Sequence, residues 1–292
     1  MNSKWPVPVV CAGLVVIAAL VAVIIGLVIT KRPPASNQLV SVTLKGGIGN
    51  QLFQMAMAYG FARRHGRKHV IHSSMVEHNP HSNTDYNNTI FRRWEKSNQE
   101  IDAKHIAKES DCFIFEDIAP TSAHHVHFIG YFQQEQYLGN YAEAFIASLD
   151  LPTHVSFLPN SCFVHMRFGD YHNSQLHSID LSVAYLQSAM QLVRQKRPGV
   201  QFVVFSDDME KSKRLPNLMH ADVSFQDESD ELRTLVAMSR CHVGGICSNS
   251  SFSWWGAYLN RNERKVVVFP RKWLNNDWPC HVHFRGAHVL DV

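Results

Sequence analysis

The feature of this sequence that most constrains its fold is a repeated order of apolar strand, polar turn and helix. The order first appears where the apolar run Leu39–Leu44 enters the turn Lys45-Gly-Gly-Ile-Gly-Asn50. Apolar residues then recur at helical spacing from Gln51 to about His65, and the short strand-like run Lys68–His72 follows. This order is typical of a βαβ unit, in which the two strands lie parallel in one sheet.

The same alternation continues through the rest of the chain, with a linker at Leu151–Pro159 between two blocks. It predicts a mostly parallel α/β fold with two lobes, residues 39–155 and residues 156–292. The remaining strands are predicted at Val126–Phe132, Ser161–Arg167, Gln201–Phe205, Asp222–Phe225, His242–Ile246 and Lys265–Phe269, and helices at Gln134–Leu149, Ser182–Lys196 and Glu228–Met238.

The N-terminus carries a different signal, a run of 23 uncharged and mainly apolar residues at positions 7–29. A membrane-spanning helix needs about 20 such residues, whereas a secretory signal peptide has a shorter apolar core and a small-residue cleavage site. We therefore expect a tail at residues 1–6, an uncleaved membrane anchor at residues 7–29 and a stem at residues 30–38. Basic residues on the two sides nearly balance, so charge alone does not give the orientation.

Composition, net charge and the spacing of His and Cys limit which kinds of ligand or partner the protein is expected to bind. The 292 residues are 45% hydrophobic and 18% charged, with a net charge of +3. Proteins that bind nucleic acid gather their basic residues into patches, so no nucleic-acid partner is expected. The densest histidine group, residues 124–127, is predicted to be a surface or strand-edge feature, because no group of His and Cys has the spacing of zinc ligands. The cysteines outside the anchor give no disulfide framework and leave room for one bridge; they are Cys112, Cys162, Cys241, Cys247 and Cys280.

A Gly-Asp turn follows the strand Ser161–Arg167, and this segment holds the strongest candidates for ligand-binding and catalytic residues. Ligands of open α/β sheets bind at the carboxyl ends of strands, so His165, Arg167 and Asp170 are expected at the mouth of a crevice. A guanidinium suits a phosphate there, because its donors fork and its charge does not titrate away. The alternative is a plain ion pair between Arg167 and Asp170 at the strand end.

Two further polar turns are predicted at the same sheet edge, Ser206-Asp207-Asp208 and Ser248–Ser253. The carboxylates of the first can accept hydrogen bonds from a ribose or from the N–H edge of guanine. The second begins a helix, whose N-terminus can bind a phosphate. Trp254 and Trp255 follow along that helix and are expected to pack in the core.

The glycine-rich turn of the first lobe matches neither common nucleotide fingerprint. Gly47 and Gly49 have no third glycine at the dinucleotide-binding spacing, and no Gly-Lys-Ser/Thr follows as in a P-loop. We expect the turn to approach a ligand closely, with the Asn50 amide at the helix start. A plain tight turn with a helix N-cap is the alternative.

Taken together, four segments resemble glycosyltransferase family 11, the α1,2-fucosyltransferases. They occur in the family's order between Leu39 and about Pro270, and the fourth is the most specific. One position departs from the pattern, because the family has two consecutive arginines and the second is Phe168 here. The segments are Gly46-Gly-Ile-Gly-Asn-Gln-Leu-Phe53, Gly130-Tyr-Phe-Gln133, His165-Met-Arg-Phe-Gly-Asp-Tyr171 and Ser248-Asn-Ser-Ser-Phe-Ser-Trp-Trp-Gly-Ala257.

The resemblance implies a GT-B-like, two-lobed enzyme. Its donor would be GDP-β-L-fucose, and it would transfer L-fucose with inversion to the 2-hydroxyl of a galactose-terminated glycan. It also implies a type II protein of the Golgi membrane with a lumenal catalytic domain. The chain has no Asp-x-Asp motif of the metal-dependent kind, so neither a metal nor a cofactor is expected beside the co-substrate GDP-fucose.

The resemblance also implies roles for individual residues. His165 is expected to contact guanine or ribose, Arg167 the β-phosphate, and Asp207 or Asp208 the nucleoside. At the start of the helix that follows the turn Ser248–Ser253, Asn249, Ser250 and Ser251 are expected to contact the phosphates. In the glycine-rich turn of the first lobe, Gly47, Gly49 and Asn50 are expected to face the fucose.

Inversion is helped by a base that takes the proton of the acceptor hydroxyl. Asp170 is the predicted base because it follows Arg167 by three residues at the crevice mouth. In the alternative it only holds the loop or orients Arg167, and a dissociative transition state would need little base. The reserve candidates are His172, His177 and Asp180.

Two predictions concern the surface. The polar stretch Ser73–Glu100 is expected to face the acceptor, and Asn87 within it is an N-glycosylation acceptor if that part of the protein is lumenal. Asn249 also begins a formal glycosylation sequon, but it is expected to be buried and unmodified.

Three other functions compete with this one. The His-x-Arg turn is similar to one in protein O-fucosyltransferases, although the Ser248–Ala257 segment argues against another linkage. The phenylalanine at position 168 motivates a non-catalytic sugar-nucleotide binder or lectin. A membrane-anchored structural protein would have no use for three polar turns at one sheet edge.

Overall fold

The computed structural model describes residues 37–77, 84–101, 106–110, 113–276, 278 and 280–291. The predicted tail and anchor, most of the stem, and Cys112 lie outside the described residues. No helix within those ranges is both long and apolar enough to cross a membrane.

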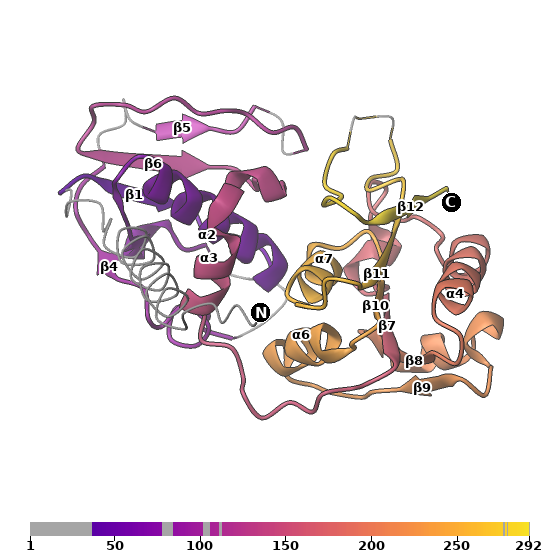
Figure 1. Cartoon of the computed structure of the whole chain (residues 1–292). Helices are drawn as coiled ribbons and strands as arrows, with labels where there is room; N and C mark the ends of the chain where they lie inside the picture. The colour runs from indigo at the N-terminus through magenta and orange to yellow at the C-terminus, as the bar shows by residue number, and fades with distance from the viewer. Residues whose placement is uncertain are drawn as a thin grey trace, which may run out of the picture.

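The first of two large parallel sheets has the strand order β2-β1-β6-β5 (Figure 1). Every pairing in it is parallel, as the βαβ pattern predicts. The strands are β1 (Leu39–Val42), β2 (Lys68–His69), β5 (Ile106–Lys108) and β6 (His125–Ile129), and the helices of this half are α2 (Ile48–Arg64) and α3 (Ala142–Ser148).

The second sheet has the order β12-β11-β10-β7-β8-β9 and is also parallel throughout. The mostly parallel α/β prediction is therefore confirmed. The strands are β7 (Ser161–Met166), β8 (Gln201–Ser206), β9 (Val223–Phe225), β10 (Gly244–Ile246), β11 (Val266–Pro270) and β12 (His288–Leu290), and the helices are α4 (Ala184–Lys196), α5 (Met209–Lys213), α6 (Glu231–Arg240) and α7 (Ser251–Tyr258).

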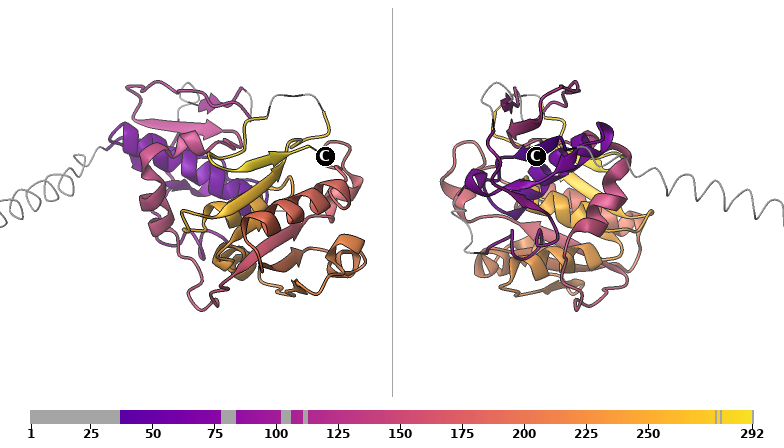
Figure 2. Two further views of the ribbon diagram at one scale, coloured as in Figure 1. Left: turned by 45° about the vertical axis from the view of Figure 1, so that its right-hand side comes forward. Right: turned by 90° about the vertical axis from the view of Figure 1, so that its left-hand side faces the viewer.

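One hydrophobic core joins the two halves. Helices α2 and α3 of the first half and α6 and α7 of the second lie between the two sheets (Figure 1). The ring of Phe53 lies 4.5 Å from that of Trp254 and 5.2 Å from that of Trp255. Both tryptophans are fully buried, which confirms their predicted role in packing. A second core lies under α4, which covers the other face of the second sheet (Figure 2).

Several predicted elements differ from those observed. The run Lys68–His72 divides into β2 and β3 (Ile71–His72), because the chain leaves the first sheet at Val70 and pairs with β4 (Lys96–Ser97) in a small separate sheet. The predicted helix at residues 134–149 is interrupted by Gly139, whose φ of 53° is incompatible with a continuous α-helix. Single 3₁₀ turns precede α3 there, at Glu135–Tyr137 and Gly139–Tyr141.

The predicted strand Lys265–Phe269 is observed as β11, but β12, which forms the edge of the second sheet, is not predicted from the sequence. Only three residues long and only half-buried, β12 has no long apolar run that would mark it in the sequence.

The prediction of a surface or strand-edge histidine cluster holds for the exposed His124 but is wrong for His125 and His127. His125 and His127 point to the same face of β6 and are buried there. The hydroxyl of Ser41 lies 2.7 Å from Nε2 of His125 and 2.8 Å from Nδ1 of His127, and the hydroxyl of Thr43 lies 2.9 Å from Nε2 of His127. These hydrogen bonds tie β6 to β1 and satisfy polar groups that burial would otherwise penalise.

This network makes folding stability depend on pH. Burial, with a smaller contribution from neighbouring histidines, lowers the pKa of His125 and His127 to about 4. In the unfolded chain the pKa of each returns to about 6.5. As pH falls from about 6.5 to 4, the unfolded chain therefore takes up protons that the folded chain does not, and the free energy of unfolding decreases.

We expect the urea midpoint of residues 37–292 to fall steadily between pH 7 and pH 5. The variant His127→Asn should be less stable at pH 7, because it loses a ring that bonds two hydroxyls, but its stability should depend less steeply on pH. An equal pH dependence in parent and variant would show that His127 is not one of the groups responsible.

Candidate active site

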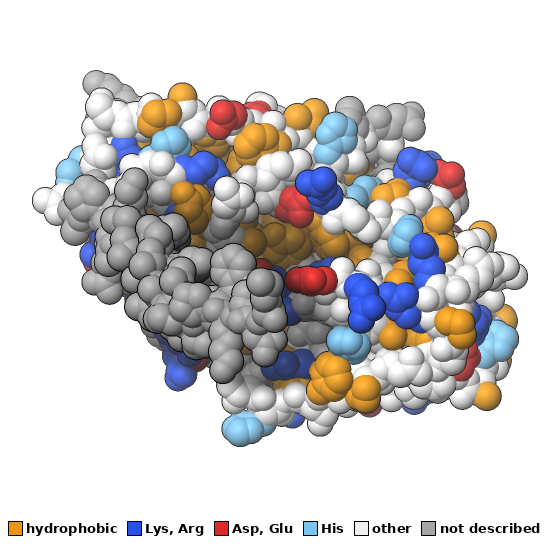
Figure 3. All heavy atoms as spheres, viewed as in Figure 1, with side chains coloured by type: hydrophobic (Ala, Val, Ile, Leu, Met, Phe, Trp, Pro, Cys, Tyr) orange, Lys and Arg blue, Asp and Glu red, His pale blue; other side chains and the backbone are white. Residues whose placement is uncertain are grey.

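A cavity of about 780 Å³ lies between the two halves of the molecule. The first half lines it with the turn after β1, residues 45–50, and the second half with the ends of β7 and β8 and the start of α7. On the face viewed in Figure 3, the two halves meet along a furrow with hydrophobic side chains at its base and charged side chains at its edges. The polar turns at the carboxyl ends of the strands in both sheets therefore surround this cavity, as expected for ligand sites in open α/β sheets.

The glycine-rich turn is held from both sides by amides of α2. Gly46 has a φ of 75°, a conformation that favours glycine. Its carbonyl accepts a hydrogen bond of 2.9 Å from the Gln51 side chain. Gln54 accepts one from the backbone N–H of Lys45 and donates one to the carbonyl of Gly130. These contacts fix where α2 begins, with Gly47 as its N-cap and Asn50 in its first turn.

The N-termini of α2 and α7 meet at this cavity. A Cβ on Gly49 would lie 2.5 Å from the backbone nitrogen of Phe252 and 2.7 Å from the hydroxyl oxygen of Ser251. Only a residue without a side chain lets the two helix ends approach so closely. The N–H groups in the first turn of a helix have no acceptor within the helix. Two such sets of donors and two positive dipole ends therefore converge on one place.

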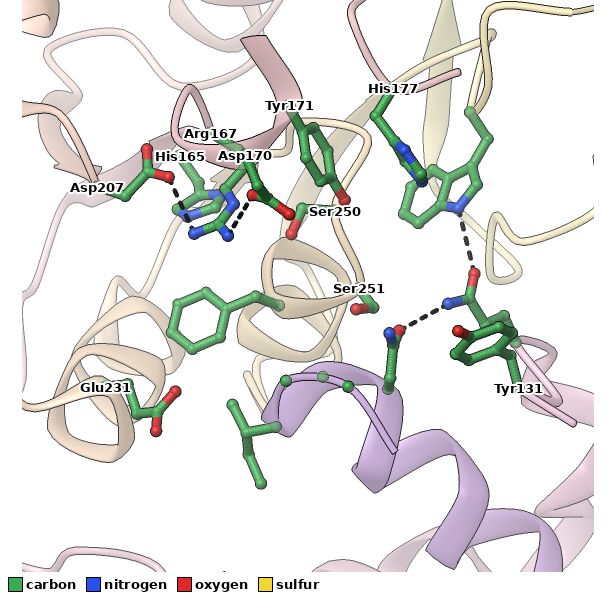
Figure 4. Close-up of a pocket in the computed structure, with 18 of the residues that line it drawn as sticks. Tyr131, His165, Arg167, Asp170, Tyr171, His177, Asp207, Glu231, Ser250 and Ser251 are labelled. Atoms are coloured by element: carbon green, nitrogen blue, oxygen red, sulfur yellow. Dashed lines mark hydrogen bonds and ion pairs between the residues drawn. The ribbon is translucent and has the colours of Figure 1, made fainter. Parts of the chain in front are cut away.

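Arg167 lies at the end of β7 between two carboxylates (Figure 4). Its guanidinium donates to Asp170 at 2.6 Å and pairs with Asp207 at 2.9 Å. Asp207 also accepts hydrogen bonds from the backbone N–H groups of Phe168 and Gly169, at 2.8 and 3.0 Å. Asp207 therefore shapes the turn that carries Arg167, and both carboxylates restrict where the guanidinium can point.

His165 lines the cavity as a buried, neutral imidazole. Burial, with a smaller effect of Arg167, lowers its pKa to about 3. Its Nδ1 lies 3.0 Å from the Ser248 hydroxyl, and its ring packs against Phe252 at 5.5 Å. It can exchange a hydrogen bond with a ligand but adds no charge near neutral pH.

The structure brings most of the predicted site residues together. Those that line the cavity are His165, Arg167, Asp170, Asp207, Ser250, Ser251, Gly47, Gly49 and Asn50. Two do not line it. Asp208 caps α5 by accepting from the N–H of Lys211 at 2.9 Å. Asn249 is buried as predicted, but its amide donates to the carbonyls of His177 and Trp273, both at 3.1 Å, so it supports the loop behind the cavity.

The predicted surface features have mixed outcomes. In the described part of Ser73–Glu100, Glu77 lines the cavity, whereas Tyr86, Ile90, Phe91 and Trp94 are buried in the core. Four side chains therefore anchor that stretch in the core, most of its other described residues are at least partly exposed, and its facing the acceptor stays a prediction. Asn87 lies half-buried in a turn where its backbone N–H donates to Asp85. Its glycosylation stays a prediction.

Residues beyond the predicted set also line the cavity. The loop from β9 to α6 and the loop after β11 both follow the carboxyl ends of parallel strands. Because ligands bind at such strand ends, these loops could have been predicted from the sequence to lie at the site. The first supplies Glu228 and Ser229 and leads into α6, which supplies Glu231 and Thr234. The second supplies Trp273, Leu274 and Trp278. Within the described ranges no group of three or more His, Cys, Asp and Glu side chains could hold a metal ion.

Comparison with known proteins places this site in a family. The sequence profile of Glycosyl transferase family 11 matches residues 7–280. The chain is 24% identical over 295 residues to an alpha-1,2-colitosyltransferase of Escherichia coli, covering 83% of this chain and 96% of that protein. It is 23% identical over 274 residues to galactoside 2-alpha-L-fucosyltransferase Sec1 of Mus musculus, covering 84% and 70%. Among solved structures it is similar to fucosyltransferase NodZ from Bradyrhizobium, with a TM-score of 0.47 and 14% identity over 75% of this chain and 91% of that one.

The family profile covers nearly the whole chain, including all four segments that carry the resemblance in the sequence. The chain therefore belongs to glycosyltransferase family 11 and is a glycosyltransferase.

Proposed function

We propose that the protein transfers L-fucose from GDP-β-L-fucose, with inversion, to the 2-hydroxyl of a galactose-terminated glycan. The observation that carries this proposal is the meeting of two helix N-termini and Arg167 at one cavity. Backbone N–H groups, dipole ends and a guanidinium together suit a diphosphate. Membership of family 11 and the names of the two relatives support the α1,2 linkage and the kind of sugar.

The strand order suggests how the donor lies. Beyond β7, which ends just before Arg167, come β8 and β9. Asp207 follows β8, Glu228 lies in the loop after β9, and Glu231 begins α6. Carboxylates on that side suit the hydroxyls of a ribose and the N–H edge of guanine. The diphosphate then lies between Arg167 and the two helix ends, with His165 beneath it.

The other end of the cavity suits the acceptor. Figure 4 shows Tyr131 and His177 on the side of Arg167 away from Glu231. Trp273 and Trp278 line this end too, and Trp278 is 62% exposed. Galactose has one face made mainly of C–H groups, so an exposed aromatic ring is a suitable surface for it.

We further propose a GT-B-like arrangement, with residues 39–155 as the acceptor-side lobe and residues 156–292 as the GDP-fucose lobe. The two parallel sheets flanking one cavity support it. The uncharged run at residues 7–29 supports a membrane anchor. With the family resemblance, it supports a single-pass type II protein of the Golgi membrane whose catalytic domain faces the lumen.

The direct test is transfer by residues 31–292 from radiolabelled GDP-fucose to lactose and to type 1 and type 2 galactosides. We expect a product fucosylated at the galactose 2-hydroxyl, with activity retained in EDTA because helix ends and Arg167 replace a divalent cation. GDP-colitose is a second donor to include, since one relative is a colitosyltransferase. Loss of activity on chelation, restored by Mn²⁺, would contradict the proposed diphosphate site, and transfer from GDP-colitose alone would change the donor.

Arg167→Ala should lower kcat/KM for GDP-fucose by about 100-fold or more, because a preorganised charged donor to the leaving diphosphate is lost. Arg167→Lys is the matched control, since it keeps the charge but loses the two-pronged geometry that Asp170 and Asp207 hold. We expect the lysine variant to lie between the parent and the alanine variant. Equal kcat/KM in all three, with unchanged melting temperature, would remove Arg167 from the site.

Asp170→Asn tests the proposed base separately from its ion pair. If Asp170 takes the proton of the acceptor hydroxyl, kcat should fall by at least tenfold across pH 5 to 8, with little change in KM for GDP-fucose. If Asp170 only orients Arg167, to which it bonds at 2.6 Å, the donor KM should change instead. A kcat within about threefold of the parent would exclude Asp170 as the base.

A further inference from the structure

We propose that Gln133 is a positioning residue that makes Asn50 present its amide NH₂ group, and not its carbonyl oxygen, to a phosphate oxygen of the bound nucleotide. This places Asn50 at the diphosphate and not at the fucose, where the family resemblance implied it. The proposal deepens the function proposed above and rests on it. The arrangement joins the two halves of the molecule, because Gln133 and Asn50 belong to the first half and Trp273 belongs to the second.

Three side chains form a hydrogen-bonded row. The indole Nε1 of Trp273 donates to Oε1 of Gln133 at 3.2 Å, and Nε2 of Gln133 donates to Oδ1 of Asn50 at 2.9 Å. The three residues come from the loop after β11, the segment after β6 and the first turn of α2. Trp273 and Gln133 are buried, at 4% and 7% exposure, and all three line the cavity.

The indole of Trp273, at one end of the row, determines which way the amides of Gln133 and Asn50 are turned. An indole N–H can only donate, so the atom of Gln133 that faces it must be the oxygen. The NH₂ group of Gln133 then faces Asn50, and the atom of Asn50 that faces Gln133 must also be an oxygen. Rotating either amide by 180° would place two donors, or two acceptors, against each other in a buried place, which costs free energy.

The NH₂ group of Asn50 is therefore turned away from Gln133. It lies on the side of Gly46, where an added Cβ would come within 2.7 Å of it. Beside it are the N–H groups that begin α2 and, against Gly49, the start of α7 at Ser251. Ser251 and the residues that begin α2 line the cavity, so these donors lie at its wall.

A place built of donors suits an oxygen that carries negative charge, and the diphosphate of a sugar nucleotide supplies one. An Asn50 turned the other way would aim a carbonyl oxygen at that phosphate. The hydrogen bonds of the row thus exclude the orientation of Asn50 in which its carbonyl oxygen would repel the phosphate.

A double-mutant cycle separates positioning from simple support. The variants are Asn50→Ala, Gln133→Met and the two combined; methionine keeps the length of glutamine without its hydrogen bonds or any charge. For each protein we would measure the Kd for GDP by calorimetry, kcat/KM for GDP-fucose, and the melting temperature.

If Gln133 acts through Asn50, Asn50→Ala should weaken GDP binding by about 10- to 100-fold and Gln133→Met by about fivefold. The combined variant should match Asn50→Ala within about twofold, since there is no amide left to orient. Additive losses would overturn the proposal, and so would GDP binding unaffected by Asn50→Ala. A lower melting temperature in Gln133→Met with unchanged GDP binding would reduce Gln133 to a structural link.

The two proposals can fail separately. A parent protein that binds GDP but transfers no fucose would overturn the proposed function, while the cycle in GDP affinity would still decide the role of Gln133. A parent that binds no GDP would overturn both.

Discussion

The close contact between the starts of α2 and α7 is the interaction on which the rest of the site depends. Gly49 packs directly on the backbone at Ser251 and Phe252, and one turn later Phe53 packs on Trp254 and Trp255. Both ends of this interface come from segments that identify the family, Gly46–Phe53 and Ser248–Ala257. Their residues are therefore packing partners as much as ligand contacts, and the same helix ends that join the halves supply the donors of the cavity.

The charges around Arg167 explain why helix ends matter there. Arg167 with Asp170 and Asp207 carries a formal sum of −1 (+1 − 2), and burial keeps His165 neutral. That cluster alone would not attract a diphosphate. The first-turn N–H groups of two helices add positive potential without a titrating group or a counter-ion. The carboxylates can then serve to fix the guanidinium while the helix ends offset their charge.

The sequence predicts the parallel sheets, the buried Trp254 and Trp255, and nine of the residues that line the cavity, because strand ends and helix starts are local features. It does not predict that Asp208 caps a helix or that Asn249 bonds two carbonyls behind the cavity, since polar residues in a turn look alike whichever way they face. The contact of Gly49 with Ser251 and the row from Trp273 to Asn50 join residues about 200 positions apart. No local pattern could indicate them.

Phe168 shows how a departure from a family pattern can be misjudged from sequence. Judged by residue type alone, it removes a positive charge from the donor site. In the structure its side chain is not among those lining the cavity; it packs against the core beneath α4, and the ammonium group of Lys211 lies 4.2 Å from the centre of its ring. Only the backbone N–H of residue 168 serves the site, by donating to Asp207. The Phe168 side chain therefore contributes packing, and the positive charge at the cavity comes from Arg167, Lys45 and the two helix ends.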